Sequence, residues 1–442
     1  MQPYLINGGI ILTFNPELPL LEDYSLLVND GKINQILKDT EIESLPYERL
    51  DAQGKIIMPG LINAHHHFYS TLVTGLTKAT PAKDFLGVLE NLWWRLDKQL
   101  TAEDIYISAL ISAMNAIRKG CTTIFDHHSS PGAIKGSLSQ IAKAIQESGI
   151  RASLCYEVSD RDGIDKCEEG ILENVTWLQQ VSQEQNPRLK GLFGMHAAFT
   201  LSDDSLQEIA DWVDKLNCGI HIHIAEGEYD ELFNIQHYGQ RVIERLCDFD
   251  LLNCHSLLAH GVHLNAREMM LIEEAGAAVI TNPQSNLNNA VGIADICKMD
   301  ELGITVGLGT DAMTTNMLEE LRIGIWAQHL KQNNPSAGFK EMTKTLLFNN
   351  PLIAQKYWGE YFGTIAEGAP ADIILIDYEP PTPLNEENWM GHIVNGISQA
   401  NVNTTICAGE ILMWNGQLML PVDENEVRKR GCELASALWE RF

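Results

Sequence analysis

Met58-Pro59-Gly60-Leu61-Ile62-Asn63-Ala64-His65-His66-His67 decides the fold, because an apolar run leads directly into three histidines. If residues 60–64 form a buried strand, the two-residue period of a strand places His65 and His67 on one side of its end and His66 on the other. Two imidazoles would then face one point, which is half of a metal site. The alternative is a solvated histidine loop, and the position of the run inside the chain, behind an apolar strand, argues against it.

Eight short apolar runs, separated by segments with helical periodicity, predict parallel β/α units from Gly60 onward. The first expected strand ends at Ala64, and the others cover residues 122–126, 152–157, 192–196, 220–224, 257–260, 278–281 and 305–309. Residues 102–119 are predicted to form a helix whose first turn Thr101 and Asp104 cap. Eight such units predict an α/β fold, the (β/α)₈ TIM barrel, whose active site lies at the C-terminal ends of the strands.

Both ends of the chain have the pattern of antiparallel β-structure. Residues 4–14 and 24–37 are β-rich and are broken at Asn7-Gly8 and Asp30-Gly31, dipeptides that favour tight hairpin turns. The sequence turns β-rich again after Gly363 and closes with an amphipathic helix from about Asn425. We therefore expect residues 1–59 and 363–442 to form one small composite β-sandwich domain beside a metal-dependent barrel of residues 60–362.

The charge of the 442-residue chain is strongly acidic, since 59 acidic and 31 basic residues give a formal net charge of −28. Such a surface repels nucleic acid and anionic membranes, so we expect a small heterocyclic substrate and neither of those partners. The nine cysteines are scattered and odd in number, which predicts reduced thiols in a cytoplasmic protein, and no apolar run reaches membrane-spanning length. We also expect a homo-oligomer, most simply a dimer.

Side chains suited to metal binding and proton transfer follow the fifth, sixth and eighth expected strands. We assign His223 as a third metal ligand and Glu226 as the acid/base, whereas His221, deeper in the fifth strand, is expected to be a core histidine. Asp311 would complete a His₃Asp set, which suits one Zn²⁺ or Fe²⁺ ion with a position left for water. His260 is expected to orient that water or the leaving group.

The order of these motifs resembles that of a known superfamily. Pro-Gly-Leu-x-x-x-His-x-His at 59–67, His-x-x-Glu at 223–226, Ala-His-Gly at 259–261 and Gly-Thr-Asp at 309–311 are similar to the motifs of the amidohydrolase superfamily, in the branch of guanine, cytosine and S-adenosylhomocysteine deaminases and chlorotriazine hydrolases. The resemblance implies one divalent metal ion per chain, zinc rather than iron, bound by His65, His67, His223 and Asp311. It also implies catalytic roles for Glu226, His260 and Asp311, the first two as groups that move protons.

Further segments narrow the resemblance within that branch. Residues 91–97, 126–131 and 282–286 (NLWWRLD, DHHSSP and NPQSN) resemble the SsnA aminohydrolases, which are linked to selenium metabolism. Two-metal members of the superfamily bridge their ions with a carboxylated lysine at the end of the fourth strand, where this chain has Gly194-Met195-His196. The absence of that lysine favours a single metal ion, and a deaminase over a cyclic-amide hydrolase.

Three side chains are candidates for contact with the substrate. His196 resembles the substrate-contacting histidine of this branch. The alternative is that its ring nitrogens form hydrogen bonds only within the protein, at the barrel mouth. Only one of His127 and His128 can face inward at the end of the second strand, and we favour His128. Trp93 or Trp94 could stack on a flat ring or pack in the interior, and we take Trp94 as the candidate. The family's substrate-reading arginine after the third strand has no clear counterpart.

The sequence thus predicts a metal-dependent hydrolytic deaminase, which acts on the C–N bond of a cyclic amidine. The expected substrate is an amino-substituted N-heterocycle, purine-like or pterin-like, that loses ammonia after attack by a metal-bound hydroxide. No glycine-rich phosphate loop precedes a helix, so a free base or pterin is favoured over a nucleotide. The alternatives are a chlorohydrolase of triazine-like substrates and a non-catalytic metal-binding barrel, and the intact Glu226 and His260 argue against the latter.

Overall fold

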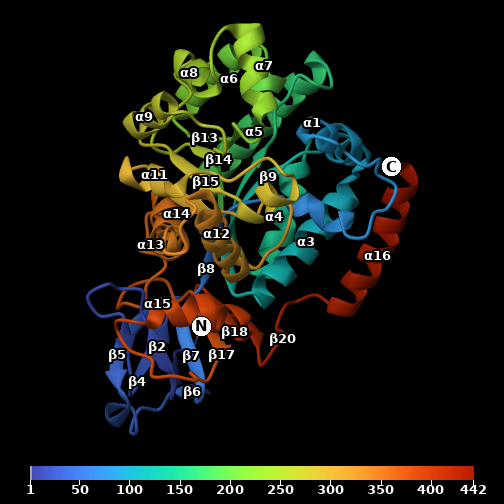
Figure 1. Cartoon of the computed structure of the whole chain (residues 1–442). Helices are drawn as coiled ribbons and strands as arrows, with labels where there is room; N and C mark the ends of the chain where they lie inside the picture. The colour runs from blue at the N-terminus through green and yellow to red at the C-terminus, as the bar shows by residue number, and fades with distance from the viewer. Residues whose placement is uncertain (1) are drawn as a thin grey trace.

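A parallel β-barrel occupies the middle of the chain in the computed structural model, which describes residues 2–442 (Figure 1). Its strands are β8 (Leu61–His66), β9 (Cys121–His128), β10 (Arg151–Tyr156), β11 (Leu189–Gly191), β12 (Phe193–Ala197), β13 (Ile220–Ile224), β14 (Leu257–His260), β15 (Ala278–Thr281) and β16 (Thr305–Leu308). β8 to β11 and β12 to β16 form two parallel sheets, and parallel bridges from Val158 to Met195 and from His66 to Asp311 join them. The TIM barrel is confirmed, with β11 and β12 sharing the place of the fourth strand.

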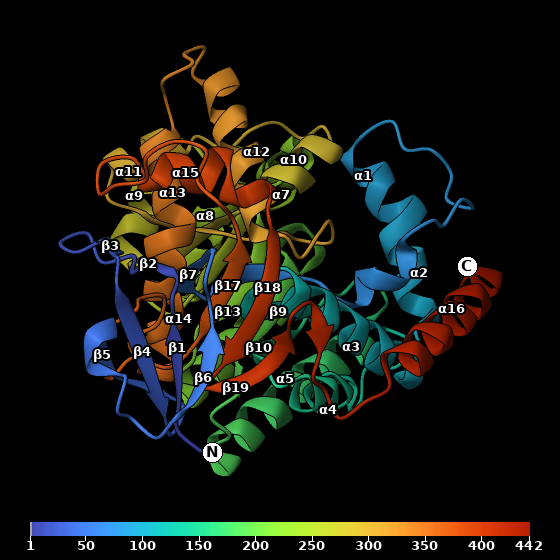
Figure 2. The same ribbon diagram turned by 90° about the horizontal axis from the view of Figure 1, so that it is seen from below.

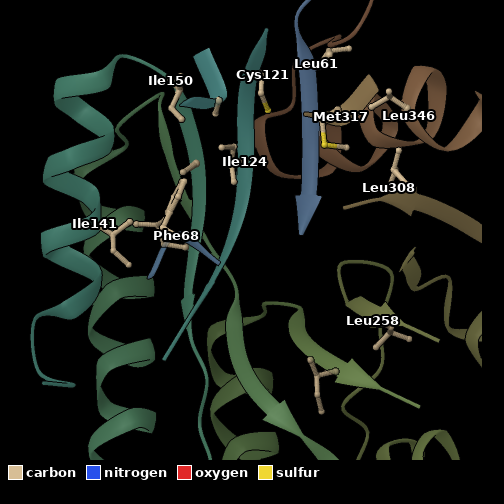
Figure 3. Close-up of a cluster of buried hydrophobic side chains, with 14 of the residues drawn as sticks. Leu61, Phe68, Cys121, Ile124, Ile141, Ile150, Leu258, Leu308, Met317 and Leu346 are labelled. Carbon is tan, nitrogen blue, oxygen red and sulfur yellow. The ribbon is translucent and has the colours of Figure 1, made fainter. Parts of the chain in front are cut away.

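The side chains of the barrel strands alternate between an inner core and an outer layer beneath the helices. Ile62 and Phe125 belong to a buried apolar cluster that joins five of the barrel strands. Leu61 and Ile124 instead belong to the outer cluster, together with Ile141 of α4 (Ser137–Ser148) (Figure 3). This alternation is the two-residue period of a strand. It also makes consecutive side chains at a strand end point in opposite directions.

Helices connect successive strands on the outside of the barrel. α3 (Ala102–Arg118) begins as predicted, because Thr101 Oγ1 accepts the N–H of Asp104 at 3.3 Å and Asp104 Oδ2 accepts the N–H of Thr101 at 2.8 Å. A helical segment of α1 (Phe85–Val88), η3 (Leu89–Trp93) and α2 (Trp94–Leu96) precedes it. The later helices are α5 (Ile164–Glu184), α6 (Asp203–Leu216), α7 (Glu228–Tyr238), α8 (Val242–Asp248), α9 (Ala266–Ala275), α10 (Pro283–Asn288), α11 (Ile296–Glu301), α12 (Met317–Lys331), α13 (Phe339–Lys344), α14 (Asn350–Trp358) and α15 (Trp389–Asn395).

Strands from both chain ends form a small β domain next to the barrel (Figure 2). One sheet has the order β5-β4-β1-β6 and the other β20-β19-β18-β17-β7-β2-β3, and apolar side chains from both form one core. β7 (Lys55–Pro59) pairs with β17 (Ile373–Asp377), so the expected small domain built from both ends is confirmed. The remaining strands are β1 (Tyr4–Asn7), β2 (Ile10–Leu12), β3 (Leu20–Leu21), β4 (Tyr24–Asn29), β5 (Lys32–Lys38), β6 (Glu48–Asp51), β18 (Asn401–Cys407), β19 (Glu410–Trp414) and β20 (Gln417–Leu418).

One of the two expected hairpin turns forms and the other does not. Asp30 and Gly31 join β4 and β5 as an antiparallel hairpin, with φ angles of 48° and 77°. At Asn7-Gly8 the chain passes from one sheet to the other, since β1 pairs with β4 and β6 whereas β2 pairs with β3 and β7. Gly8, with a φ of 85°, makes a bend between two sheets there.

The C-terminal helix α16 (Glu424–Arg441) is present as predicted and lies along α3 of the barrel (Figures 1 and 2). Arg430 pairs with Glu103 at 2.7 Å and Arg441 with Asp104 at 2.6 Å. The boundaries 1–59, 60–362 and 363–442 therefore remain a proposal, because the last helix packs on the barrel. Across residues 2–442, every helix is too short or too polar to span a bilayer.

Candidate metal centre and active site

Four strand ends bring the predicted metal ligands to one point in the barrel mouth. His67 Nε2 lies 2.8 Å from Asp311 Oδ1 and 3.2 Å from His223 Nε2. His65 Nε2 lies 3.6 Å from Asp311 Oδ1, and His260 Nε2 lies 3.9 Å from Asp311 Oδ2. Potential ligand atoms of His65, His223, His260 and Asp311 all lie within 4.8 Å of one another. This spacing allows one ion to be surrounded.

Hydrogen bonds that Nδ1 donates turn the Nε2 lone pairs of two imidazoles toward this point. The Nδ1–H of His67 donates to the carbonyl of His127 at 2.5 Å, and the Nδ1–H of His223 donates to the carbonyl of His196 at 2.8 Å. Both Nε2 atoms are then acceptors, and a 3.2 Å contact between two lone pairs is repulsive unless a cation shares them. The geometry therefore fits a bound metal ion.

Two further imidazoles present buried nitrogens to the same point. His65 Nδ1 is 2.9 Å from His221 Nε2, and His260 Nδ1 is 2.8 Å from Asn286 Oδ1. The Nε2 atoms of His65 and His260 are buried and have no hydrogen-bond partner within the described chain. A buried nitrogen without a hydrogen-bond partner is suited to bind a metal ion. His65 therefore fits the His₃Asp set that binds zinc, and His260 lies beside that set.

His66 points away from the metal site, as the alternation of β8 predicts. Its Nδ1 donates to the carbonyl of Asp311 at 2.8 Å, and its Nε2 accepts from Ser112 Oγ at 2.8 Å. Asp311 has a left-handed φ of 51°, a conformation that costs free energy in a non-glycine residue. The bond from His66 helps to hold that conformation, and so positions the carboxylate ligand.

Glu226 lies beside the ligands, just beyond the end of β13, and the residue is 7% exposed. Its Oε2 atom is 3.4 Å from His260 Nε2, and its Oε1 atom accepts a hydrogen bond from Asn289 Nδ2 at 3.2 Å. Burial, and then the nearby Asp311 carboxylate, raise the pKa of Glu226 to about 8. A carboxyl group that holds its proton near neutral pH can serve as a general acid.

An aromatic-walled cavity of about 810 Å³, part of it open to solvent, contains Glu226 and the ligands His67, His223 and Asp311 on its wall. Trp94 and His196, two of the predicted substrate contacts, also line it, with ring centroids 6.0 Å apart. His196 Nδ1 is 2.9 Å from Thr200 Oγ1, which leaves its other nitrogen for a ligand. Other aromatic lining residues are Tyr69, Phe85, Trp93 and Phe199.

His128, the third predicted substrate contact, lies outside this cavity, which corrects the choice made between it and His127. It has no exposed surface, and its Nε2 is 2.9 Å from Ser130 Oγ. His128 lies on the same face of β9 as Ile124, which points to the outer layer. His127 lies on the same face as Phe125, which points inward. His127 consequently lies among the ligand histidines.

Two polar cavity residues after β10 were not identified from the sequence. Arg161 lines the cavity, binds the carboxylate of Asp97 and donates to Ser129 Oγ at 3.0 Å, so an arginine does follow the third strand. Glu157 lines the cavity directly beyond the strand end. Their positions in the loop after a barrel strand could have identified them from the sequence, because side chains in these loops converge on the barrel mouth.

Comparison with known proteins agrees with this geometry. Residues 56–412 match the model of the amidohydrolase family. The chain is 32% identical over 428 residues to a 5'-deoxyadenosine deaminase of Methanobrevibacter smithii, with 94% of each chain covered. It is 30% identical over 441 residues to a 5-methylthioadenosine/S-adenosylhomocysteine deaminase of Carboxydothermus hydrogenoformans, with 98% of each covered.

Solved structures share the fold at lower sequence identity. A zinc-bound adenosine deaminase from Xanthomonas campestris superimposes with a TM-score of 0.86 at 21% identity, covering 98% of both chains. Zinc-bound atrazine chlorohydrolase TrzN from Arthrobacter aurescens gives a TM-score of 0.80 at 21% identity, covering 99% of this chain and 100% of that one. The barrel, the converging histidines and the family match lead to one conclusion: this chain belongs to the amidohydrolase family.

Proposed function

We propose that this enzyme removes an amino group hydrolytically from a purine-like ring and releases ammonia, with one zinc ion held by His65, His67, His223 and Asp311. The observation that carries the proposal is the convergence of these ligands beside Glu226, at the wall of an aromatic-lined cavity. The two deaminase relatives support the reaction type, and the zinc-bound structures support the choice of metal.

A bound zinc ion supplies a nucleophile by lowering the pKa of a water molecule toward neutrality. The protein's own acceptors, Asp311 Oδ2 and His260 Nε2, lie on the side of the site next to Glu226 and can hold the attacking water by its protons. Glu226 donates its proton to the ring nitrogen beside the amine-bearing carbon, passes one proton of the attacking water to the amine and takes up the other, which restores its protonated form. The amine leaves as neutral ammonia, which is a far better leaving group than an amide anion.

The substrate class follows from the cavity and from the relatives together. The names of the relatives give 5'-deoxyadenosine, 5-methylthioadenosine and S-adenosylhomocysteine as their substrates, which are adenine nucleosides. We therefore include nucleosides beside the free bases and pterins expected from the sequence. Trp94 and His196 are the proposed contacts to the flat ring, since both line the cavity that contains Glu226 and three of the metal ligands.

Three finer assignments are proposals that rest on the sequence. The segments 91–97, 126–131 and 282–286 support closer kinship with the SsnA aminohydrolases. The scattered cysteines support a cytoplasmic location, and a homodimer is the expected assembly.

Ammonia release across a substrate panel tests the proposed reaction. The panel contains adenine, 5'-deoxyadenosine, 5-methylthioadenosine, guanine and isoxanthopterin, and it includes atrazine because a chlorohydrolase would release chloride from it. We expect ammonia from at least one purine, with close to one zinc per chain by elemental analysis. Zinc-loaded protein that releases ammonia from none of these compounds would contradict the proposal, and about two metal ions per chain would contradict the single-metal site.

A further inference from the structure

Glu157 is a carboxylate in the cavity wall for which the deamination chemistry gives no role. It directly follows β10, is 5% exposed and lines the same cavity as Glu226. Its Oε1 atom is buried and has no hydrogen-bond partner among residues 2–442. A buried acceptor without a donor destabilises the free protein, so a ligand that supplies a donor gains affinity there.

The donors nearest to Glu157 Oε1 are engaged elsewhere or lie beyond hydrogen-bond distance. Ring nitrogens of His196 and His223 also lie within 4.8 Å of the Glu157 carboxylate, and neither is a hydrogen-bond partner of Oε1. His67 Nδ1 is 3.3 Å from Oε1 but already donates its proton to the carbonyl of His127 at 2.5 Å. His127 Nδ1 is 3.7 Å away, beyond hydrogen-bond distance. The guanidinium of Arg161 is paired with the carboxylate of Asp97. Holding a metal ligand or an arginine in place therefore does not explain the carboxylate of Glu157.

The position of Glu157 limits which part of a substrate can reach it. The carboxylate contacts His67 on its Nδ1 side, while Nε2 of the same ring faces Asp311 and the metal position. One imidazole ring thus separates Glu157 from the metal position. A fused heterocycle whose reacting carbon lies at the metal is wider than that separation, so its own edge can extend to Glu157. A substituent that points out of the barrel mouth extends away from Glu157.

We propose that Glu157 is a specificity-determining residue that accepts a hydrogen bond from a ring N–H of the substrate, distinct from the departing amine. This inference rests on the proposed function and narrows it to heterocycles that keep a free ring N–H, such as a purine base unsubstituted at its five-membered ring. The same base alkylated at that nitrogen lacks the donor and leaves Glu157 unsatisfied, which weakens binding.

Calorimetric binding of adenine and 9-methyladenine to the zinc-loaded protein tests the proposal. Both ligands are measured in Glu226→Gln, which prevents turnover, and in the double variant that also carries Glu157→Met, because methionine has a similar length and lacks a carboxylate or amide acceptor. We expect the Glu226→Gln protein to bind adenine about 10- to 100-fold more tightly than 9-methyladenine, which is the range for a hydrogen bond to a charged acceptor. In the double variant this ratio should fall to within about threefold of one. Glu168→Met, which removes an exposed carboxylate from α5, is the matched control and should keep the ratio.

Several outcomes overturn the proposal. Equal affinities for the two ligands before Glu157 is changed would do so, as would a ratio that survives Glu157→Met or an absence of binding by either ligand. Binding of 5'-deoxyadenosine is the last measurement: if Glu157→Met weakens it but does not weaken the binding of adenine, the donor is a ribose hydroxyl and the ring assignment is wrong. Absence of ammonia release by the wild type, together with a preserved affinity ratio, would contradict the proposed reaction and leave the role of Glu157 supported.

Discussion

Replacement of Glu226 by glutamine tests the proton transfers on which the proposed reaction depends. The amide keeps the shape of the side chain and its position 3.2 Å from Asn289 Nδ2 and 3.4 Å from His260 Nε2, but it cannot cycle a proton. General acid–base catalysis contributes about 100- to 10,000-fold in rate, or about 2.7 to 5.4 kcal/mol of barrier. Glu226 has two proton transfers to perform and a pKa raised to about 8 by burial, so we expect a loss of about 1,000-fold or more in kcat.

The assay combines ammonia release from a panel substrate with zinc analysis of the same preparation. Zinc content and KM should change little, because the four assigned ligands and the shape of the cavity are retained. Glu228→Gln, which removes an equal charge from the exposed start of α7, is the matched control and should keep the wild-type kcat. Loss of zinc in Glu226→Gln would make Glu226 a metal ligand, and a kcat within a few-fold of wild type would refute its role in proton transfer.

Three further perturbations test the metal, the substrate contact and the C-terminal helix. Removal of zinc with a chelator should abolish ammonia release and lower Tm in scanning calorimetry, because an ion that binds only the folded state stabilises it; an unchanged Tm would contradict the metal site. His196→Ala should lower kcat/KM by about 10- to 100-fold while zinc is retained, since His223 bonds to the carbonyl of His196, which alanine keeps. Unchanged kinetics would remove His196 from the substrate site. Trp439→Ala should speed proteolysis of residues 74–84 several-fold, because Trp439 Nε1 donates to the carbonyl of Leu72 at 2.8 Å beside that loop. The half-exposed Trp326→Ala is its control, and equal cleavage rates in the two variants would show that α16 does not hold the loop.

Features set by local periodicity could be predicted from the sequence. The expected strands 220–224, 257–260 and 278–281 coincide with β13, β14 and β15, because each is a short apolar run that a buried parallel strand requires. The opposite directions of His65 and His66 follow from the same two-residue period. His223, at the end of such a run, was predicted for the same reason.

Features set by long-range packing could not be predicted in this way. Arg161 lies beyond the regular part of β10, and its direction depends on Asp97, which begins the short helix η4 (Asp97–Gln99), distant in the sequence. Alternate side chains of β9 face the barrel interior, and this alternation decides whether His127 or His128 points inward. The sequence pattern did not show which of the two alternating sets faces the interior. The docking of α16 brings together residues such as Arg430 and Glu103, which are separated by more than half of the chain.

Hydrogen bonds within the protein join the segments that carry the metal ligands, and β8 is the element that makes them. The carbonyl of His65 accepts the backbone N–H groups of both Thr310 and Asp311, at 2.9 and 3.0 Å. Asn63 Nδ2 donates to Thr310 Oγ1 at 2.6 Å, which adds a side-chain bond between the same two segments. The strand that carries two ligand histidines therefore also fixes the backbone that carries the ligand carboxylate. Because these bonds lie within the protein, they fix the relative positions of the two backbone segments that carry His65, His67 and Asp311.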